Sequence, residues 1–229
     1  MRLYSTGKDR IIHCHDLAAK KTHSAVKTSN SRPYELEIDT DLERLYVSTR
    51  EGMVLIFDVK QHVPLMIHMI SLYQNRPKAG KTPTPDFIKQ MDLDRNRNIL
   101  ICRSKAGVIS CVQLINRGQV KSAVIERIDS YSGEKLDNLC RFKWLSRMSC
   151  YCEGTQKGYL KIRDIEKGGD TQLMLHAGFS DQVSVVYYDG EKNVLFAASK
   201  DGQFRVWKVP HEWRSKAIEE REQEAEYHR

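Results

Sequence analysis

The chain has 229 residues, a net charge of +7 and a hydrophobic content of 40%, so it is long enough for one all-β domain with a sizeable core. No apolar run reaches the ~18 residues of a membrane-spanning helix, and the polar N-terminus lacks the apolar stretch of a signal peptide. We therefore expect an intracellular protein without a membrane span, in the cytoplasm in the simplest case and with nucleus and cilium as alternatives.

The first segment predicts two strands followed by a basic loop. Arg2 to Ser5 and Ile11 to His15 have the alternating character of short strands. Together they make residues 1–16 half of a four-stranded unit. The next stretch, residues 17–32, is polar and basic, and we expect a solvated loop there; its cations include Lys20, Lys21 and Lys27.

Residues 33–72 predict a complete unit of four strands. The last of these contains the run Leu65 to Ile70, which is apolar apart from one histidine and is therefore expected to be buried on both faces. A Pro-rich insert follows at residues 75–85 and is expected to form a solvated loop. Its cations are Arg76, Lys78 and Lys81.

Three further units follow in chain order. Short alternating runs bounded by turn residues indicate strands rather than helices in each of them. A polar insert at residues 130–137 separates the unit at 87–128 from the unit at 138–170. The units span residues 87–128, 138–170 and 171–209.

The last twenty residues have a different composition. Residues 210–229 consist mostly of good helix formers and predict a short acidic C-terminal helix or tail. Its apolar positions make only a partial stripe. We expect Trp213 and Ile218 to pack on the last unit, with the remainder in solvent or on a partner.

One short sequence motif, a strand, a turn and a second strand, recurs in all five units. In its clearest copy Asp201 and Gly202 form a turn between two alternating strands, since glycine adopts a positive φ without a Cβ clash. A repeat of this kind, built from short strands, is typical of a β-propeller in which each unit is one blade. The closing residues of successive copies are 42, 55, 51 and 44 positions apart, at Asp16, Asp58, Gln113, Asp164 and Lys208.

The repeated residues resemble those of the WD-repeat family. In the last unit the resemblance rests on Ser199, Asp201, Gly202 and Trp207, and the position of the family's aspartate is filled in three other units by Asp16, Asp58 and Asp164. The resemblance implies an all-β, incomplete propeller of about four and a half blades with a short C-terminal helix. It also implies a scaffold that presents its faces and loops to several protein partners.

Several positions depart from the family's pattern. Phe179 occupies the place of the family's histidine, so the side-chain hydrogen-bond network that this histidine makes through a blade is not expected in its usual form. The tryptophan of the pattern is replaced in the other units by His15, Phe57, Val112 and Arg163.

Pairs of acidic residues mark the turn between the first two strands of three units. Short acidic side chains accept hydrogen bonds from backbone N–H groups in turns. Because the pairs lie on separate blades, we expect them to stabilise turns rather than to form a catalytic or Ca²⁺-binding cluster. They are Asp39 with Asp41, Asp92 with Asp94, and Asp189 with Glu191.

No motif in the sequence indicates catalysis, a cofactor or a metal. The patterns of serine hydrolases, zinc proteases and P-loop nucleotide-binding proteins do not occur, so we expect a protein that is not an enzyme. The six cysteines lack C-x-x-C spacing and are expected to be reduced and mostly buried. His13 and His15 share one face of a strand, which we interpret as a polar strand surface rather than a metal site.

The incomplete first unit favours a function in protein binding. An open propeller leaves strand edges that can pair with another chain. Either the sequence is part of a longer protein, or another subunit completes or extends the propeller. We expect a non-catalytic interaction scaffold in a multiprotein assembly, with contacts at the two inserts and the tail.

The basic residues support a second hypothesis, a module that binds RNA or another anionic surface. The first 32 residues contain seven bases and two acids, and such asymmetry favours phosphate contacts. Aromatic residues are not interleaved with the bases as a stacking surface requires, and a solvated basic loop explains the same pattern. The residues in question are Lys20, Lys21, Lys27, Arg76, Lys78 and Lys81.

Overall fold

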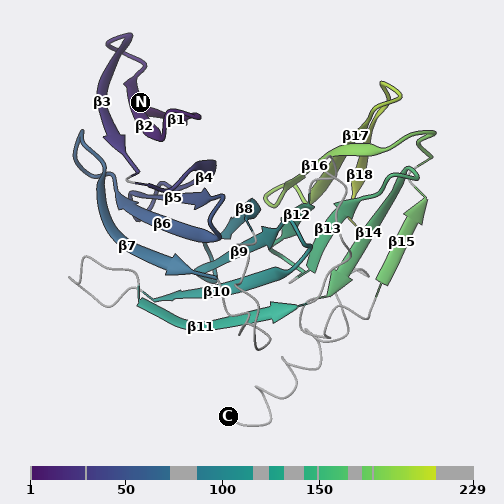
Figure 1. The fold of residues 1–229 in the computed structure, drawn as a ribbon. Coiled ribbons are helices and arrows are strands. Elements are labelled where there is room, and N and C mark those ends of the chain that lie inside the picture. The colour runs from purple at the N-terminus through teal and green to yellow at the C-terminus, as the bar shows by residue number, and fades with distance from the viewer. Residues whose placement is uncertain are drawn as a thin grey trace. The chain divides into compact units, whose positions relative to one another are not determined.

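The structure, a computed structural model, consists of β-strands in its described part (Figure 1). The expected insert at 75–85, positions 132–137 of the second insert and the tail at 210–229 lie outside the described residues. The predicted C-terminal helix is therefore not among the elements that we describe. The described residues are 2–28, 30–72, 87–115, 124–131, 142–148, 150–164, 172–176 and 178–209.

The strands form five small antiparallel sheets, and each sheet is a simple meander of strands that are consecutive in the chain. The first sheet consists of β1 (Arg2–Thr6), β2 (Ile11–Asp16) and β3 (Lys21–Lys27), and the second of β4 (Pro33–Asp39), β5 (Arg44–Thr49), β6 (Met53–Asp58) and β7 (Leu65–Ser71). The third consists of β8 (Ile88–Asp94), β9 (Ile99–Ser104), β10 (Ile109–Ile115) and β11 (Val124–Tyr131). The fourth consists of β12 (Phe142–Leu145), β13 (Cys150–Gly154), β14 (Tyr159–Asp164) and β15 (Gln172–His176), and the fifth of β16 (Val183–Asp189), β17 (Val194–Ser199) and β18 (Phe204–Lys208).

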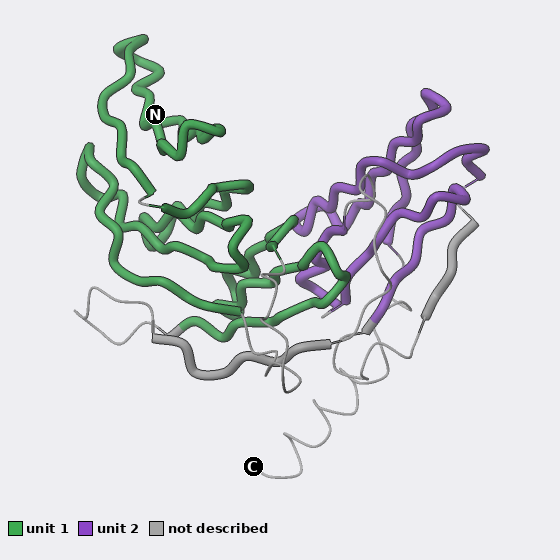
Figure 2. The backbone as a smooth tube through the Cα atoms, in the orientation of Figure 1, with its two compact units in different colours: residues 1–135 green, residues 136–229 purple. Residues whose placement is uncertain are grey.

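These sheets belong to two compact units, coloured separately in Figure 2. The first unit, Met1–Lys135, contains the first three sheets, and the second unit, Leu136–Arg229, contains the last two. Inside each unit the first strands of successive sheets are neighbours: β4 lies against β1 and β8, and β16 lies against β12. This arrangement, in which small meanders meet at their first strands, agrees with the expected blades of a propeller.

The loop expected over residues 17–32 is wrong for its central part, because Lys21–Lys27 forms strand β3. This strand pairs with β2, with Val26 opposite Ile12. Most of its side chains are polar and exposed, so the segment has no apolar period to reveal it. Its backbone hydrogen bonds to β2 and the contact of Val26 with the core are what make it a strand. The first sheet therefore has three strands instead of two.

Two expected boundaries also move. β15 pairs with β14 rather than with the last sheet, for example through Leu173 opposite Ile162. The fourth sheet thus ends after His176, and the boundary expected between residues 170 and 171 is wrong. β11 continues to Tyr131, so the first two residues of the expected insert at 130–137 belong to this strand.

The central strands of the second sheet, β5 and β6, are buried on both faces. Leu45 and Phe57 pack on one face, together with Ile12 of the first sheet. Tyr46 and Ile56 pack on the opposite face, against apolar residues of the third sheet. Successive residues of a strand point to opposite faces, so one strand with apolar residues at every position supplies two separate cores.

The core of the second unit is built in the same way. Cys152 and Ile162 of the fourth sheet pack against Val186 and Leu195 of the fifth. All four side chains are buried. Successive sheets of each unit therefore adhere through apolar faces, and this burial is the main force that stacks them.

Strand β7 differs from its expectation. The apolar run Leu65 to Ile70 was expected to be buried on both faces, but Leu65 is 61% exposed and Met66 and Met69 are also exposed. Only Ile70 of this strand is buried. β7 is the last strand of its sheet and has a paired neighbour along one edge only, so it lies at the margin of the sheet, away from the buried central strands β5 and β6.

The cysteines agree with their expectation where the structure describes them. Of the five cysteines in the described residues, all except Cys111 are buried. Burial raises the pKa of the Cys102 and Cys152 thiols well above the ordinary value. These two therefore act as small apolar side chains between sheets, with Cys102 in one core and Cys152 in another. Cys140 lies outside the described residues.

In the part of the chain that the structure describes, no helix has the length and hydrophobicity needed to cross a lipid bilayer.

Candidate interaction surfaces

The repeated aspartates organise turns at the ends of strands. The Asp16 carboxylate accepts hydrogen bonds from the backbone N–H groups of Ala18 and Ala19, at 2.8 and 3.1 Å. The N–H group of Ala19 is the main cause of the lowered pKa of Asp16. Asp58 accepts from the N–H group of Lys60 at 2.9 Å. The side chain of Asp164, at the end of β14, lies outside the described part.

The Asp-Gly turn of the last sheet has the predicted geometry. Gly202 has a φ of 80°, and its N–H group donates to the carbonyl of Ser199 at 3.2 Å. Asp201 accepts from the N–H group of Gln203 at 2.9 Å. In the first sheet, whose copy lacks the glycine, Arg10 takes the positive φ, at 64°. The turn is therefore kept without its preferred residue, at some cost in backbone strain.

The expected acid pairs do stabilise turns, through one member of each pair. Asp39 accepts from the N–H groups of Asp41 and Leu42. Asp94 accepts from the N–H group of Arg97, and Asp189 from those of the second and third residues after it. The repeat position is thus the last residue of β4, β8 and β16. The sequence aligned Asp92 with this position, two residues too early.

Trp207 packs against the residue that replaces the family's histidine. Its ring meets that of Phe179 edge to face, with the centroids 6.2 Å apart. The guanidinium of Arg205 lies 5.4 Å from the centre of the Phe179 ring and donates to the carbonyl of Gly178 at 2.9 Å. At this place the WD-repeat family has a histidine hydrogen-bond network. This chain has an aromatic pair with a cation above one ring instead.

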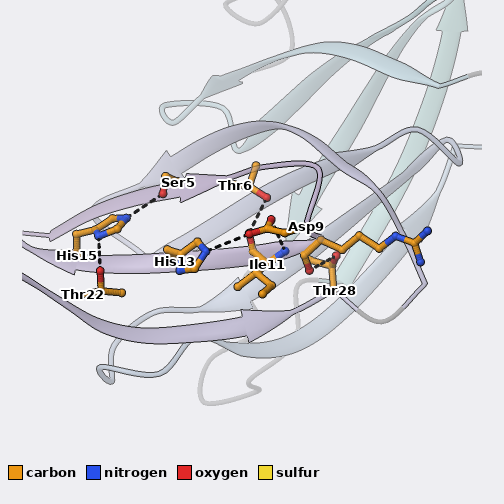
Figure 3. A network of polar contacts seen from close by, with 9 residues as sticks. Ser5, Thr6, Asp9, Ile11, His13, His15, Thr22 and Thr28 are labelled. Atoms are coloured by element: carbon orange, nitrogen blue, oxygen red, sulfur yellow. Dashed lines mark hydrogen bonds and ion pairs between the residues drawn. The ribbon is translucent and has the colours of Figure 1, made fainter.

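The first sheet has a face that we call the histidine face and define as Leu3, Ser5, His13, His15 and Thr22. Its polar side chains form a network (Figure 3). Nε2 of His15 lies 2.9 Å from the Ser5 hydroxyl, and Nδ1 lies 3.0 Å from the Thr22 hydroxyl. His13 stacks on His15 and contacts the Asp9 carboxylate at 3.3 Å. Leu3 is the one large aliphatic residue of the histidine face.

The histidine face is not a three-residue metal site. Cys14, between the two histidines, points to the opposite face and is buried. No group of three potential ligands that could hold a metal ion occurs among the described residues. The face instead satisfies its imidazoles with hydroxyl groups and a carboxylate.

The last sheet has an apolar outward face, which we call the aromatic face and define as Val185, Tyr187, Phe196, Phe204 and Val206. Strand register places these residues on one side of β16, β17 and β18. Phe196 is central, with ring centroids 5.9 Å from Tyr187 and 6.0 Å from Phe204. Phe204 is 63% exposed and Tyr187 55%. Such a cluster is unusual for a solvent-facing sheet surface.

A second apolar surface follows the outer strand of the second sheet. Val63, Leu65, Met66 and Met69 are all exposed and lie on or just before β7. Methionine side chains adapt to different partner shapes. This surface is therefore also suited to protein contact.

The predicted contact residues are only partly described. Lys20, Lys21 and Lys27 are exposed, at the turn before β3 and on β3 itself, and their charges also discourage another strand from pairing with this edge. The other predicted contact residues are not described, so these three lysines are the ones that can be placed. Arg76, Lys78, Lys81, Trp213 and Ile218 lie outside the described residues.

Sequence reasoning missed the aromatic face. The signal was present, because Tyr187, Phe196, Phe204 and Val206 interrupt the alternation that a sheet with one solvated face should have. Alternation by itself does not say which side of β18 is covered. In the structure Phe204 and Val206 point outward, and Trp207 points inward to the core.

Comparisons with solved structures identify similar folds at low sequence identity. The chain is similar over 87% of its length to a chain in the crystal structure of a Mitotic Checkpoint Complex, with a TM-score of 0.59 and 14% identity, and covers 55% of that chain. It is similar over 92% of its length to Raptor from Chaetomium thermophilum, with a TM-score of 0.65 and 15% identity, and covers 19% of that chain. The chain thus spans about half of the first protein and about a fifth of the second.

No model of a protein family matches the sequence, and no curated protein does. Identities of 14% and 15% establish a common fold and nothing further. The likeness supports an all-β protein made of small blade-like sheets. Function has to be argued from the surfaces of this chain.

Proposed function

We propose that the protein is a non-catalytic interaction scaffold of the WD-repeat propeller type and works as a subunit of a larger protein assembly. Five small sheets, with repeated Asp-containing turns between their strands, support the propeller part of this proposal. The propeller is incomplete in the sense that its first and last sheets have three strands in the described residues, where the others have four.

The observation that carries the proposal is the gathering of exposed apolar side chains on two surfaces. Of the eleven large apolar residues exposed in the described part, eight lie on or next to β7 or on the aromatic face. Scattered exposed apolar residues are normal, but contiguous ones mark binding surfaces. They bury more favourably against protein than against RNA, whose contacts are dominated by phosphate.

The structural neighbours are consistent with this role. One of them was solved as part of a complex, the Mitotic Checkpoint Complex. The other is a much longer protein, Raptor, of which this chain covers 19%. By analogy we propose that the present chain also functions within a larger body.

The proposal is tested by purifying the tagged full chain from cells that express it naturally and measuring the mass of its complex by mass photometry. We expect stoichiometric protein partners that remain bound in both 0.1 and 0.5 M salt and after nuclease treatment. Phosphate-driven binding would fall steeply over this salt range. A mass equal to that of the chain alone contradicts the proposal. Loss of the partners after nuclease treatment also contradicts it and would favour the RNA-binding hypothesis.

A further inference from the structure

The repeat allows each sheet to be compared with the last one, position by position. In the second sheet the N–H group of Gly52 donates to the carbonyl of Thr49, and in the last sheet that of Gly202 donates to the carbonyl of Ser199. These turns therefore place Ser199 at the position of Thr49. Counting outward from them along the paired strands gives equivalent positions: Tyr46 with Phe196, Val54 with Phe204, and Ile56 with Val206.

The equivalent positions have opposite exposures in the two sheets. Tyr46, Val54 and Ile56 are all 0% exposed, because the third sheet packs on them. Phe204 and Val206 are 63% and 50% exposed. The last sheet thus has an exposed apolar face at the positions on which, in the second sheet, the third sheet packs.

The fourth sheet shows the same rule inside the second unit. Its equivalent residues are Cys152, Leu160 and Ile162, and they are buried under the fifth sheet. Two sheets therefore use this face to bind a following sheet. The aromatic face has the chemistry of such an interface, because it consists of aliphatic and aromatic side chains.

We propose that the aromatic face binds a β-sheet of another polypeptide, and that this partner sheet presents an apolar face and packs where a following blade would. This inference rests on the proposed scaffold function and names the surface and the kind of partner. Phe196, Phe204 and Val206 are the central contacts. The partner chemistry follows from what covers the equivalent positions in the second and fourth sheets.

The histidine face is a poor complement for the aromatic face. Its central side chains, Ser5, His13 and His15, are polar and take part in hydrogen bonds. Burying them against phenylalanine would remove water from these groups without offering new hydrogen bonds. For this reason the proposed partner is a different sheet, and neither the first sheet of this chain nor that of a second copy.

The edge of the last sheet offers a further contact for the same partner. In the second and fourth sheets the third strand pairs with a fourth, as β6 does with β7 and β14 with β15. Among the described residues, β17 is the one strand that pairs with β18. The outer edge of β18 can therefore accept a strand of the partner through backbone hydrogen bonds, next to the exposed Phe204 and Val206.

The proposal is tested in the full-length chain by replacing Phe204 with the photo-crosslinking residue p-benzoylphenylalanine in cells that express the protein naturally. We expect crosslinks to a strand segment of a different polypeptide, with apolar residues at alternate positions. Met66→p-benzoylphenylalanine, on β7, is the matched control, and its crosslinks should fall on other peptides. Crosslinks from position 204 to residues 210–229 of the same chain, to a second copy, or to no protein would overturn the proposal.

The identified partner then allows a binding test. The double variant Phe204→Ser, Val206→Ser should lower its co-purification by at least about tenfold, since both side chains are central anchors of the interface. The double variant Leu65→Ser, Met69→Ser removes two equally exposed apolar residues from β7 and should leave this partner bound. Both pairs are exposed in the chain, so thermal unfolding of each variant should match that of the wild type.

Loss of the docking site and loss of the scaffold function give different results. If the assembly remains complete with the Phe204→Ser, Val206→Ser variant, the aromatic face is not the docking site, while the scaffold function stands. If the wild-type chain is found in no assembly, the scaffold function itself is wrong.

Discussion

The first and last sheets are both three-stranded in the described residues, but they end the series in opposite ways. The turn that joins β1 to β2 corresponds to the turn between the second and third strands of a complete sheet, so the three described strands of the first sheet correspond to the second, third and fourth. In the last sheet the same turn joins β17 to β18, so its three described strands correspond to the first, second and third.

Their outward faces differ even more. The histidine face satisfies its polar groups by internal hydrogen bonds and is suited to water. The aromatic face exposes Phe204 and Tyr187 and gains stability when another surface covers it. The difference teaches that the side chains of a terminal sheet decide whether its outward face suits water or another apolar surface.

The largest expected difference is in thiol reactivity on the equivalent faces of the fourth and fifth sheets. Phe204→Cys places a thiol on the aromatic face, where Leu160 is the buried equivalent, near Cys152 of the fourth sheet. Burial raises the pKa of Cys152. Cys152 should therefore react with a disulfide reagent at least about a hundredfold more slowly than the thiol introduced at position 204. Labelling followed by mass spectrometry, with the wild type as the control, measures both rates. Equal slow rates would mean that the aromatic face is covered in the free chain.

The second prediction contrasts the two faces of the last sheet. Leu195→Ala removes a fully buried side chain from the core and should cost about 2–5 kcal/mol of unfolding free energy. Phe204→Ala removes a larger side chain from the opposite face and should change the unfolding free energy by no more than about 0.5 kcal/mol. Urea denaturation of both variants tests this. Similar costs at the two positions would contradict the outward orientation of Phe204.

The third prediction concerns the histidine face. His15→Ala removes the ring that links the hydroxyl groups of Ser5 and Thr22, and should cost about 1 kcal/mol, since these contacts are partly exposed. Ser5→Ala removes one of the two contacts and should cost less. The order is checked by urea denaturation. A variant His15→Ala as stable as the wild type would mean that the network is formed equally well by water.

The smallest expected effect is the pH dependence of an aspartate turn. The N–H group of Lys192 is the first cause of the lowered pKa of Asp189, so the folded chain holds this carboxylate charged more readily than the unfolded chain does. The stabilisation is present above about pH 4, the ordinary range of the group, and is lost as the pH falls through the lowered value. Asp189→Ala should therefore reduce Tm slightly at pH 7, and by progressively less as the pH falls below about 4. Asp189→Asn keeps an acceptor oxygen and should recover part of the difference at pH 7.

The sequence predicted the features that depend on local chemistry. Strands with apolar periodicity, such as Met53–Asp58, and turns with a strong local signal, such as that at Asp201 and Gly202, occur where they were expected. Their conformations depend on residues within a few positions of one another. Strand β3 escaped prediction because its polar side chains carry no such signal, and its conformation depends on pairing with β2.

The amino-acid sequence by itself determined that the chain forms short strands, repeated turns and five successive units, because alternation and turn chemistry are properties of neighbouring residues. Only the tertiary structure decided which apolar residues are covered. Val54 and Phe204 occupy equivalent positions in their strands, yet one is buried and the other is 63% exposed. Burial is a property of the surface that packs opposite, and the third sheet packs on Val54, while the aromatic face around Phe204 is open.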